Sequence, residues 1–167
     1  MKIKIGFGFD VHQLKIGHPF IMGGVNLAHD RGAFGHSDAD VLLHAICDAI
    51  LGAANLRDIG FHFPNTDDKW KGVSSMLLLQ EVMKLIAAKN FALGNIDCMI
   101  CLEAPKINPH IPEMKTNIAT AIGISEEDIS INLEQIQLQT LPFTNYIPYK
   151  LVGNLSADLK INGTAKS

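Results

Sequence analysis

Two short polar motifs constrain the fold most strongly, because they lie far apart in the chain yet carry complementary side chains. Asp10-Val11-His12 directly follows a strand pattern, and His44 falls inside a helix pattern. Two histidines and a carboxylate are a standard ligand set for zinc with one open coordination position. Such a zinc polarises a phosphoryl or carbonyl oxygen. Each side chain alone is more often a surface or packed core residue, so the prediction depends on a turn that aims Asp10 and His12 inward together.

The segment around His44 has the pattern of a helix. Ser37 is the predicted N-cap, Asp40 is its capping-box partner, and the helix is expected to run to about Asn55. Asp40, His44 and Asp48 are spaced at i, i+4 and i+8, so they share one face. The residues expected on the buried side are Val41, Leu42, Ala45, Ile46, Ala49 and Ile50.

Strand and helix patterns alternate along the rest of the chain. Strands are expected over 2–9, 20–22, 94–102 and 128–133, and further helices over 75–89 and 112–123. Gly23-Gly24 marks a turn, and Pro112 is typical of the first position of a helix. The alternation predicts an α+β fold in which helices pack on one face of a mixed β-sheet.

Composition narrows the function classes. The chain has 167 residues, a formal net charge of −3 and only two arginines, Arg31 and Arg57, so no basic surface for nucleic acid is expected. The first twenty residues lack an apolar signal segment, and no apolar stretch is long enough to span a membrane. The odd number of cysteines suits a reducing compartment, so we expect a cytoplasmic protein. Cys98 and Cys101 have CxxC spacing inside an apolar strand pattern, which favours packing over redox chemistry.

Two polar loops each have two interpretations. Residues 58–67 are typical of a turn that ends a helix, and they also suit a loop that binds the hydroxyls of a polyol. Residues 104–112 form a proline-rich loop before a helix. There Lys106 and free helix N–H groups are able to receive a phosphate.

Taken together, these motifs resemble the 2-C-methyl-D-erythritol 2,4-cyclodiphosphate synthase family of the non-mevalonate isoprenoid pathway. The motifs that carry the resemblance are 6–12, 35–44, 58–60 with 63–67, and 104–106 with 109–112, within residues 1–131. The resemblance implies a homotrimer with active sites between neighbouring subunits. It also implies a lyase whose substrate is 4-diphosphocytidyl-2-C-methyl-D-erythritol 2-phosphate. The 2-phosphate attacks the β-phosphorus and expels CMP, giving the cyclic diphosphate.

The resemblance also assigns roles to residues. Asp10, His12 and His44 would hold zinc, and the candidate catalytic residues His36 and Ser37 would contact the phosphates or the erythritol. The residues implied to hold the erythritol hydroxyls are Asp58, Gly60, Phe63, Asn65, Thr66 and Asp67. The residues implied to lie against the cytidine are Ala104, Pro105, Lys106 and Ile107. A second metal, Mg²⁺ or Mn²⁺, would bind the substrate diphosphate through a protein ligand that the sequence does not identify.

The chain departs from the family at Asn65, where the family usually has aspartate, and over residues 132–167. The family's threonine-rich segment with its metal-binding glutamate is not recognisable there. Gln137 stands at the glutamate position, and Glu134 is three residues early. Residues 1–131 are therefore interpreted as the family core and 132–167 as a divergent tail of the same domain. A truly divergent end, a decayed copy and a reading-frame change remain open, as does a catalytically impaired zinc-binding trimeric homologue.

Overall fold

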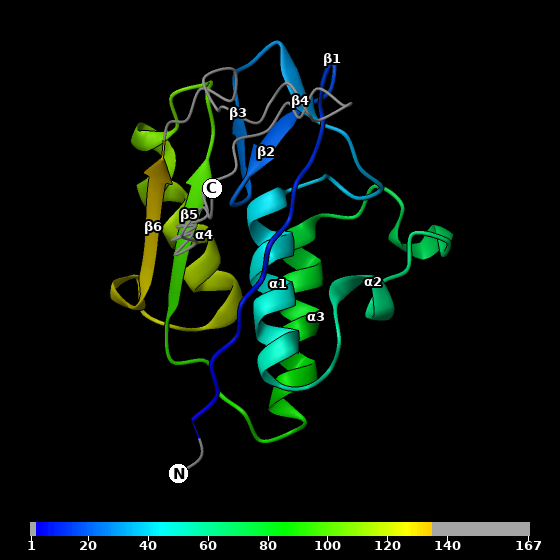
Figure 1. Cartoon of the computed structure of the whole chain (residues 1–167), viewed down its shortest axis with the longest axis vertical. Coiled ribbons are helices and arrows are strands. Elements are labelled where there is room, and N and C mark those ends of the chain that lie inside the picture. Colours follow the sequence, from blue (N-terminus) through cyan, green and yellow to red (C-terminus); the bar gives the residue numbers. More distant parts are fainter. Residues whose placement is uncertain (1–2, 135–167) are drawn as a thin grey trace, which may run out of the picture.

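The structure is a computed structural model, and it describes residues 3–134 (Figure 1). These residues form an α+β fold of helices and small sheets, as predicted. The helices are α1 (Val41–Ala53), α2 (Ile59–His62), α3 (Ser75–Ala87) and α4 (Ile111–Ile122), with short 3₁₀ turns η1 (Asp68–Trp70), η2 (Asn108–His110) and η3 (Glu126–Asp128). The strands are β1 (Leu14–Ile16), β2 (Phe20–Met22), β3 (Val25–Leu27), β4 (Arg31–Ala33), β5 (Ile96–Cys101) and β6 (Ile129–Glu134).

The strands of the described residues form three separate pairs, which corrects the prediction of one mixed sheet. β1 pairs antiparallel with β4, β2 antiparallel with β3, and β5 parallel with β6. The β2–β3 hairpin closes through Gly23 and Gly24, whose φ angles of +57° and +74° suit a tight two-residue turn. A parallel pair needs a crossover, and the chain between β5 and β6 supplies it through α4.

The N-terminal segment, residues 3–13, forms no strand, and the predicted strand over 2–9 is therefore wrong for the residues that are described. Its glycines instead rest on α1 (Figure 1). A Cβ at Gly6 would lie 1.8 Å from the carbonyl oxygen of Ala49, and one at Gly8 would lie 1.9 Å from that of Ala45. The alternating pattern thus reflects small residues packed on a helix rather than a strand in a ladder.

The core lies between the helices and the strand pairs, and α1 runs beside α3 (Figure 1). The two helices bury apolar residues against each other, including Leu43, Leu51, Leu79 and Val82, each 0% exposed. Predicted boundaries of α3 and α4 hold to within two residues, and α4 ends at Gly123 with φ +75°. Among the helices of the described residues, none combines the length and apolar character needed to cross a membrane.

Asp40, rather than the predicted Ser37, is the N-cap of α1. Its Oδ1 accepts a hydrogen bond from Leu43 N at 3.1 Å, while its Oδ2 accepts one from Gly24 N at 2.7 Å. One fully buried carboxylate therefore starts the helix and ties it to the β2–β3 turn. Ser37 is left free to face a different partner, His44.

Candidate metal centre

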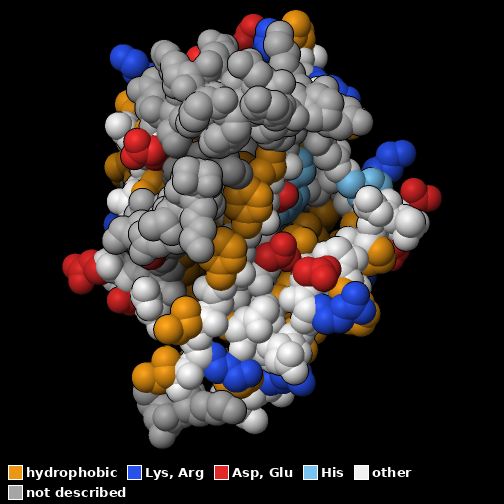
Figure 2. All heavy atoms as spheres, in the orientation of Figure 1, with side chains coloured by type: hydrophobic (Ala, Val, Ile, Leu, Met, Phe, Trp, Pro, Cys, Tyr) orange, Lys and Arg blue, Asp and Glu red, His pale blue; other side chains and the backbone are white. Residues whose placement is uncertain are grey.

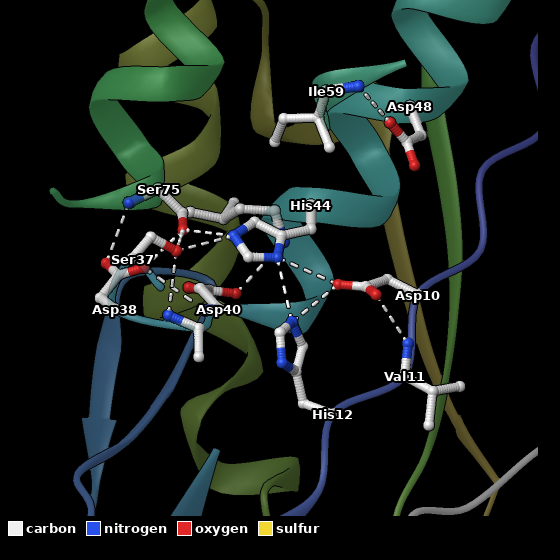
Figure 3. Close-up of polar contacts among 12 residues, drawn as sticks. Asp10, Val11, His12, Ser37, Asp38, Asp40, His44, Asp48, Ile59 and Ser75 are labelled. Carbon is white, nitrogen blue, oxygen red and sulfur yellow. Dashed lines mark hydrogen bonds and ion pairs between the residues drawn. The ribbon is translucent and has the colours of Figure 1, made fainter. Parts of the chain in front are cut away.

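The three predicted zinc ligands converge at one point (Figure 3). Asp10 and His12 come from the N-terminal segment and His44 from the first turn of α1. Asp10 Oδ2 lies 2.9 Å from His12 Nε2 and 3.0 Å from His44 Nδ1, and the two imidazole nitrogens are 3.1 Å apart. Ligands bound tetrahedrally at zinc distances of 2.0–2.1 Å would be separated by about 3.3 Å. The donor atoms of Asp10, His12 and His44 are therefore almost as far apart as the ligands of a bound zinc ion. This group of three side chains, called the metal cluster below, is able to hold a metal ion.

The outer nitrogen of each histidine has a hydrogen-bond partner that orients its ring. His12 Nδ1 lies 3.2 Å from the carbonyl oxygen of Phe34, to which it donates. His44 Nε2 lies 2.9 Å from Ser75 Oγ and 3.0 Å from Ser37 Oγ. Such outer contacts fix which nitrogen faces a metal and raise the ligand's basicity. The donor set and its supports both fit a divalent cation.

The carboxylate and the imidazoles also change one another's proton affinity. Burial raises the pKa of Asp10, but its interactions with the rings of His12 and His44 outweigh this effect, and the pKa of this carboxyl falls far below its ordinary value. The hydrogen bond to Asp10 raises the pKa of His12 above its ordinary 6.5, against the opposing effect of burial. In the absence of metal, the contact therefore favours the ionised form of Asp10 and extends the protonated form of His12 to higher pH.

The two predicted catalytic residues lie on the loop that leads into α1. This loop is held against the start of α3, because Gly72 N donates to His36 O at 2.9 Å and Asp38 N donates to Val73 O at 3.1 Å. Ser37 faces the metal ligand His44. Within residues 3–134, His36 Nε2 is a buried side-chain atom that has no hydrogen-bond partner.

The 58–67 loop is attached to α1 by a hydrogen bond to Asp48, which lies one helical turn beyond His44. Asp48 Oδ1 accepts from Ile59 N at 2.7 Å, which fixes the start of α2 (Figure 3). Asp58 caps α2 through Phe61 N, and Asp67 caps η1 through Lys69 N. The aspartates of this loop thus serve as caps, as the turn interpretation expects, but the segment contains the short helix α2 rather than only a turn that ends α1. Gly60, Asn65 and Thr66 are exposed, and the binding of a ligand by this loop stays a prediction.

Burial raises the pKa of Asp48, and the charges of Asp58 and Asp10 raise it further. Asp58 of the loop and Asp10 of the metal cluster therefore both lie close enough to Asp48 to raise its pKa. Phe63, the C-cap of α2, packs edge-on against Trp70 with their ring centroids 4.8 Å apart. This contact closes the loop onto η1.

Residues 104–107, which are predicted to contact the cytidine, lie in the connection between β5 and α4. Ala104 and Lys106 are exposed and Pro105 is partly buried, whereas the side chain of Ile107 is 0% exposed and belongs to the core. In the described part of the chain, no hydrogen bond or ion pair joins residues 104–107 to the metal cluster. Ile107 is able to meet a ligand only through its backbone.

A cavity of about 120 Å³ lies beside the cluster. It is bounded by the N-terminal segment, α1 and β5, and its lining includes Asp10, His12, Val41 and Met99. Figure 2 shows histidine side chains in a hollow of this face, with acidic side chains at its margin. The cluster therefore lies beside a space that other groups can enter.

Sequence reasoning missed the residues that support the ligands. Ser75 was expected only as the first residue of the helix over 75–89, and Asp38, within the 35–44 motif, was given no role of its own. Ser75 N donates to Asp38 Oδ2 at 3.0 Å, and Ser75 Oγ donates to Asp38 Oδ1. The sequence contains one relevant pattern, the pair Ser74-Ser75 before an apolar periodic segment. This pattern indicates the start of a helix, but it does not reveal that Ser75 contacts His44.

An α+β fold with a carboxylate and two imidazoles aimed at one point defines a candidate metal-binding enzyme. A model of the YgbB family matches residues 3–140, and the chain belongs to this family of 2-C-methyl-D-erythritol 2,4-cyclodiphosphate synthases.

Curated relatives and a solved structure agree with this assignment. The chain is 62% identical over 131 residues to the synthase of Cytophaga hutchinsonii, covering 78% of this chain and 82% of the relative. It is 56% identical to that of Bacteroides fragilis over the same shares. A solved synthase described as the CDP-bound form is 34% identical, with a TM-score of 0.74, over 78% of this chain and 87% of that one.

Proposed function

We propose that this protein converts 4-diphosphocytidyl-2-C-methyl-D-erythritol 2-phosphate to 2-C-methyl-D-erythritol 2,4-cyclodiphosphate and CMP. In this reaction an oxygen of the 2-phosphate forms a bond to the β-phosphorus, and the bond from that phosphorus to the oxygen of CMP breaks. The observation that carries the proposal is the convergence of Asp10, His12 and His44 in a chain of this family. The protein would act as a cytoplasmic lyase.

Joining two anionic phosphates requires charge neutralisation and an in-line arrangement rather than a protein nucleophile. Zinc held by Asp10, His12 and His44 would supply a Lewis acid for a phosphoryl oxygen. Mg²⁺ or Mn²⁺ on the substrate diphosphate is the second proposed ion, and its protein ligand is not assigned.

The chain's own residues would bind and orient the substrate around this centre. Among residues 3–134, Nε2 of His36 has no hydrogen-bond partner, and Ser37 lies on the same loop beside His44. We propose that both contact the phosphates or the erythritol. The loop with Asp58, Gly60, Phe63, Asn65, Thr66 and Asp67 would hold the hydroxyls, and its attachment to α1 through Asp48 supports this role. The segment Ala104, Pro105, Lys106 and Ile107 would lie against the cytidine.

Two further features complete the proposal. The active form is proposed to be a homotrimer with sites between neighbouring subunits, and residues 1–131 are proposed as its functional core. The divergent tail is predicted to span residues 132–167, and the part of it after Glu134 lies outside the described residues. A catalytically impaired zinc-binding trimer is the alternative, because the sequence after residue 131 departs from the family pattern.

The test is incubation of the purified chain with the substrate, Zn²⁺ and Mg²⁺, followed by ³¹P NMR. The proposal predicts resonances of a cyclic diphosphate together with CMP. His44→Ala should abolish turnover, whereas His29→Ala, which changes a histidine of the β3–β4 connection, should retain it. Intact substrate in the presence of zinc-loaded, folded protein would contradict the enzyme and favour the impaired homologue.

A further inference from the structure

A partly buried network of hydrogen bonds connects Asp10, His12 and His44 to the start of α3. Asp38 accepts from the hydroxyl of Ser75, whose Oγ lies 2.9 Å from His44 Nε2. The other nitrogen of His44, Nδ1, lies 3.0 Å from Asp10 Oδ2 (Figure 3). Ser75, at the centre of this network, is 0% exposed, whereas Asp38, His44 and Asp10 are partly buried.

The positions of the hydrogens in this hydrogen-bond network follow from the chemistry of Asp38. An ionised carboxylate only accepts hydrogen bonds, so the hydroxyl hydrogen of Ser75 is committed to Asp38. Ser75 Oγ then offers only lone pairs to His44, and Nε2 must carry the hydrogen that fills the contact. The lone pair of a neutral His44 consequently lies on Nδ1, which faces Asp10 and His12.

Two neighbours of His44 favour the opposite arrangement. Asp10 attracts a hydrogen onto Nδ1, because its carboxylate is also only an acceptor. Ser37 Oγ, which accepts from Ala39 N at 3.2 Å, is able to direct its own hydrogen toward Nε2. The tautomer of His44 therefore depends on whether the Asp38–Ser75 pair holds the hydrogen on Nε2.

We infer that Asp38 and Ser75 set the tautomer of His44 and keep its Nδ1 lone pair directed at the metal position. Ser75 is thus a positioning residue. This inference deepens the proposed function and rests on its metal site, although the tautomer itself is a property of the metal-free chain. Supporting partners of this kind are typically worth 10–100-fold in metal affinity.

The chain offers a matched control at the adjacent serine. Ser74 is the N-cap of α3, and its Oγ accepts from Met76 N at 3.3 Å without contacting His44. Ser74→Ala should weaken α3 and leave the histidine unchanged. Ser75→Ala removes the acceptor for Nε2–H, and Ser75→Thr keeps a hydroxyl at that place.

Asp38→Asn offers a second route to the same result. An amide oxygen that accepts from Ser75 N would leave its NH₂ group facing Ser75 Oγ. The hydroxyl hydrogen of Ser75 would then turn toward His44 Nε2, and the imidazole hydrogen would move to Nδ1. This variant tests the inference even if Ser75→Ala does not fold.

The experiment is long-range ¹H–¹⁵N NMR of the metal-free chain at a pH where His44 is neutral, paired with zinc titration against a chromophoric chelator. We expect Nε2–H in the parent, Ser74→Ala and Ser75→Thr chains. Ser75→Ala and Asp38→Asn should shift toward Nδ1–H and bind zinc about 10–100-fold more weakly. An unchanged tautomer in both would overturn the inference. A parent chain with Nε2–H that binds no zinc would instead contradict the metal site of the proposed function.

Discussion

The backbone of Gly8 rests directly on the carbonyl of Ala45, the residue that follows the proposed metal ligand His44. A Cβ at Gly8 would lie 1.9 Å from that oxygen. This contact sets the N-terminal segment against α1 just before Asp10 and His12. The two ligands that lie outside helices and strands are thereby placed beside the one that α1 carries.

Gly8→Ala should therefore move Asp10 and His12 away from His44. We expect a loss of about 1–3 kcal/mol in the free energy of unfolding, typical of overpacking, together with weaker zinc binding. Thermal melts and zinc titration measure the two effects. Gly52→Ala is the control, because a Cβ there meets no atom of the described residues within 4 Å and alanine favours the helix by about 1 kcal/mol. Equal zinc affinity in both variants would contradict the role of the Gly8 contact.

Asp40→Asn should destabilise the chain without touching the metal ligands. An amide has one oxygen, so it is unable to accept from both Gly24 N and Leu43 N as the carboxylate does. One buried N–H would lose its partner, at a cost of about 1–3 kcal/mol. Chemical denaturation measures this, with exposed Asp30→Asn as the control. An Asp40→Asn variant as stable as the parent chain would show that one of these hydrogen bonds contributes nothing.

The metal-free chain should lose stability as the pH rises above 6.5. The pKa of His12 is raised in the folded chain, so its stabilising contribution is complete below the ordinary value of 6.5 and disappears as the pH passes the folded value. Zinc affinity should change in the opposite direction over this window, because a metal requires neutral His12. Melting temperatures with and without zinc test this. Parallel pH dependence in both states would contradict it.

Asp48→Ala should weaken substrate binding much more than it changes zinc affinity, since Asp48 interacts with Asp10 and His44 only through their charges. The substitution releases Ile59 N from α1 and loosens the loop that begins at Asp58. A severalfold increase in KM is expected from the lost positioning, with a stability cost of about 1 kcal/mol. Kinetics with the proposed substrate measure KM, and Asp97→Ala on β5 is the control. A change in zinc affinity as large as the change in KM would show that Asp48 acts mainly on Asp10, His12 and His44 instead.

Local patterns predicted the long helices well, because α1, α3 and α4 each combine apolar periodicity with a recognisable start or stop. The cap of α1 was misassigned because Ser37 and Asp40 both suit that role. Only the tertiary structure shows that Asp40 serves the helix and the Gly24 turn, while Ser37 faces His44. Propensity alone does not rank such alternatives.

The N-terminal segment shows a second limit of sequence patterns. Alternation over 2–9 is equally consistent with a strand and with glycines seated on a helix, and only the position of α1 distinguishes them. The convergence of Asp10, His12 and His44 was predictable, since donor type and motif context point to these three residues. Their supports, Ser75 and Asp38, were not, because the contact joins α3 to a loop 37 residues away.

The most direct test of the central claim, that Asp10, His12 and His44 form a metal centre, is X-ray absorption spectroscopy of the zinc-loaded chain. The account predicts one shell of nitrogen and oxygen ligands at about 2.0–2.2 Å, with the multiple-scattering pattern of two imidazoles. His44→Ala should remove one imidazole or prevent loading. A zinc–sulfur distance of about 2.3 Å, which would place the ion on cysteine, or a spectrum unchanged by His44→Ala, would contradict the account.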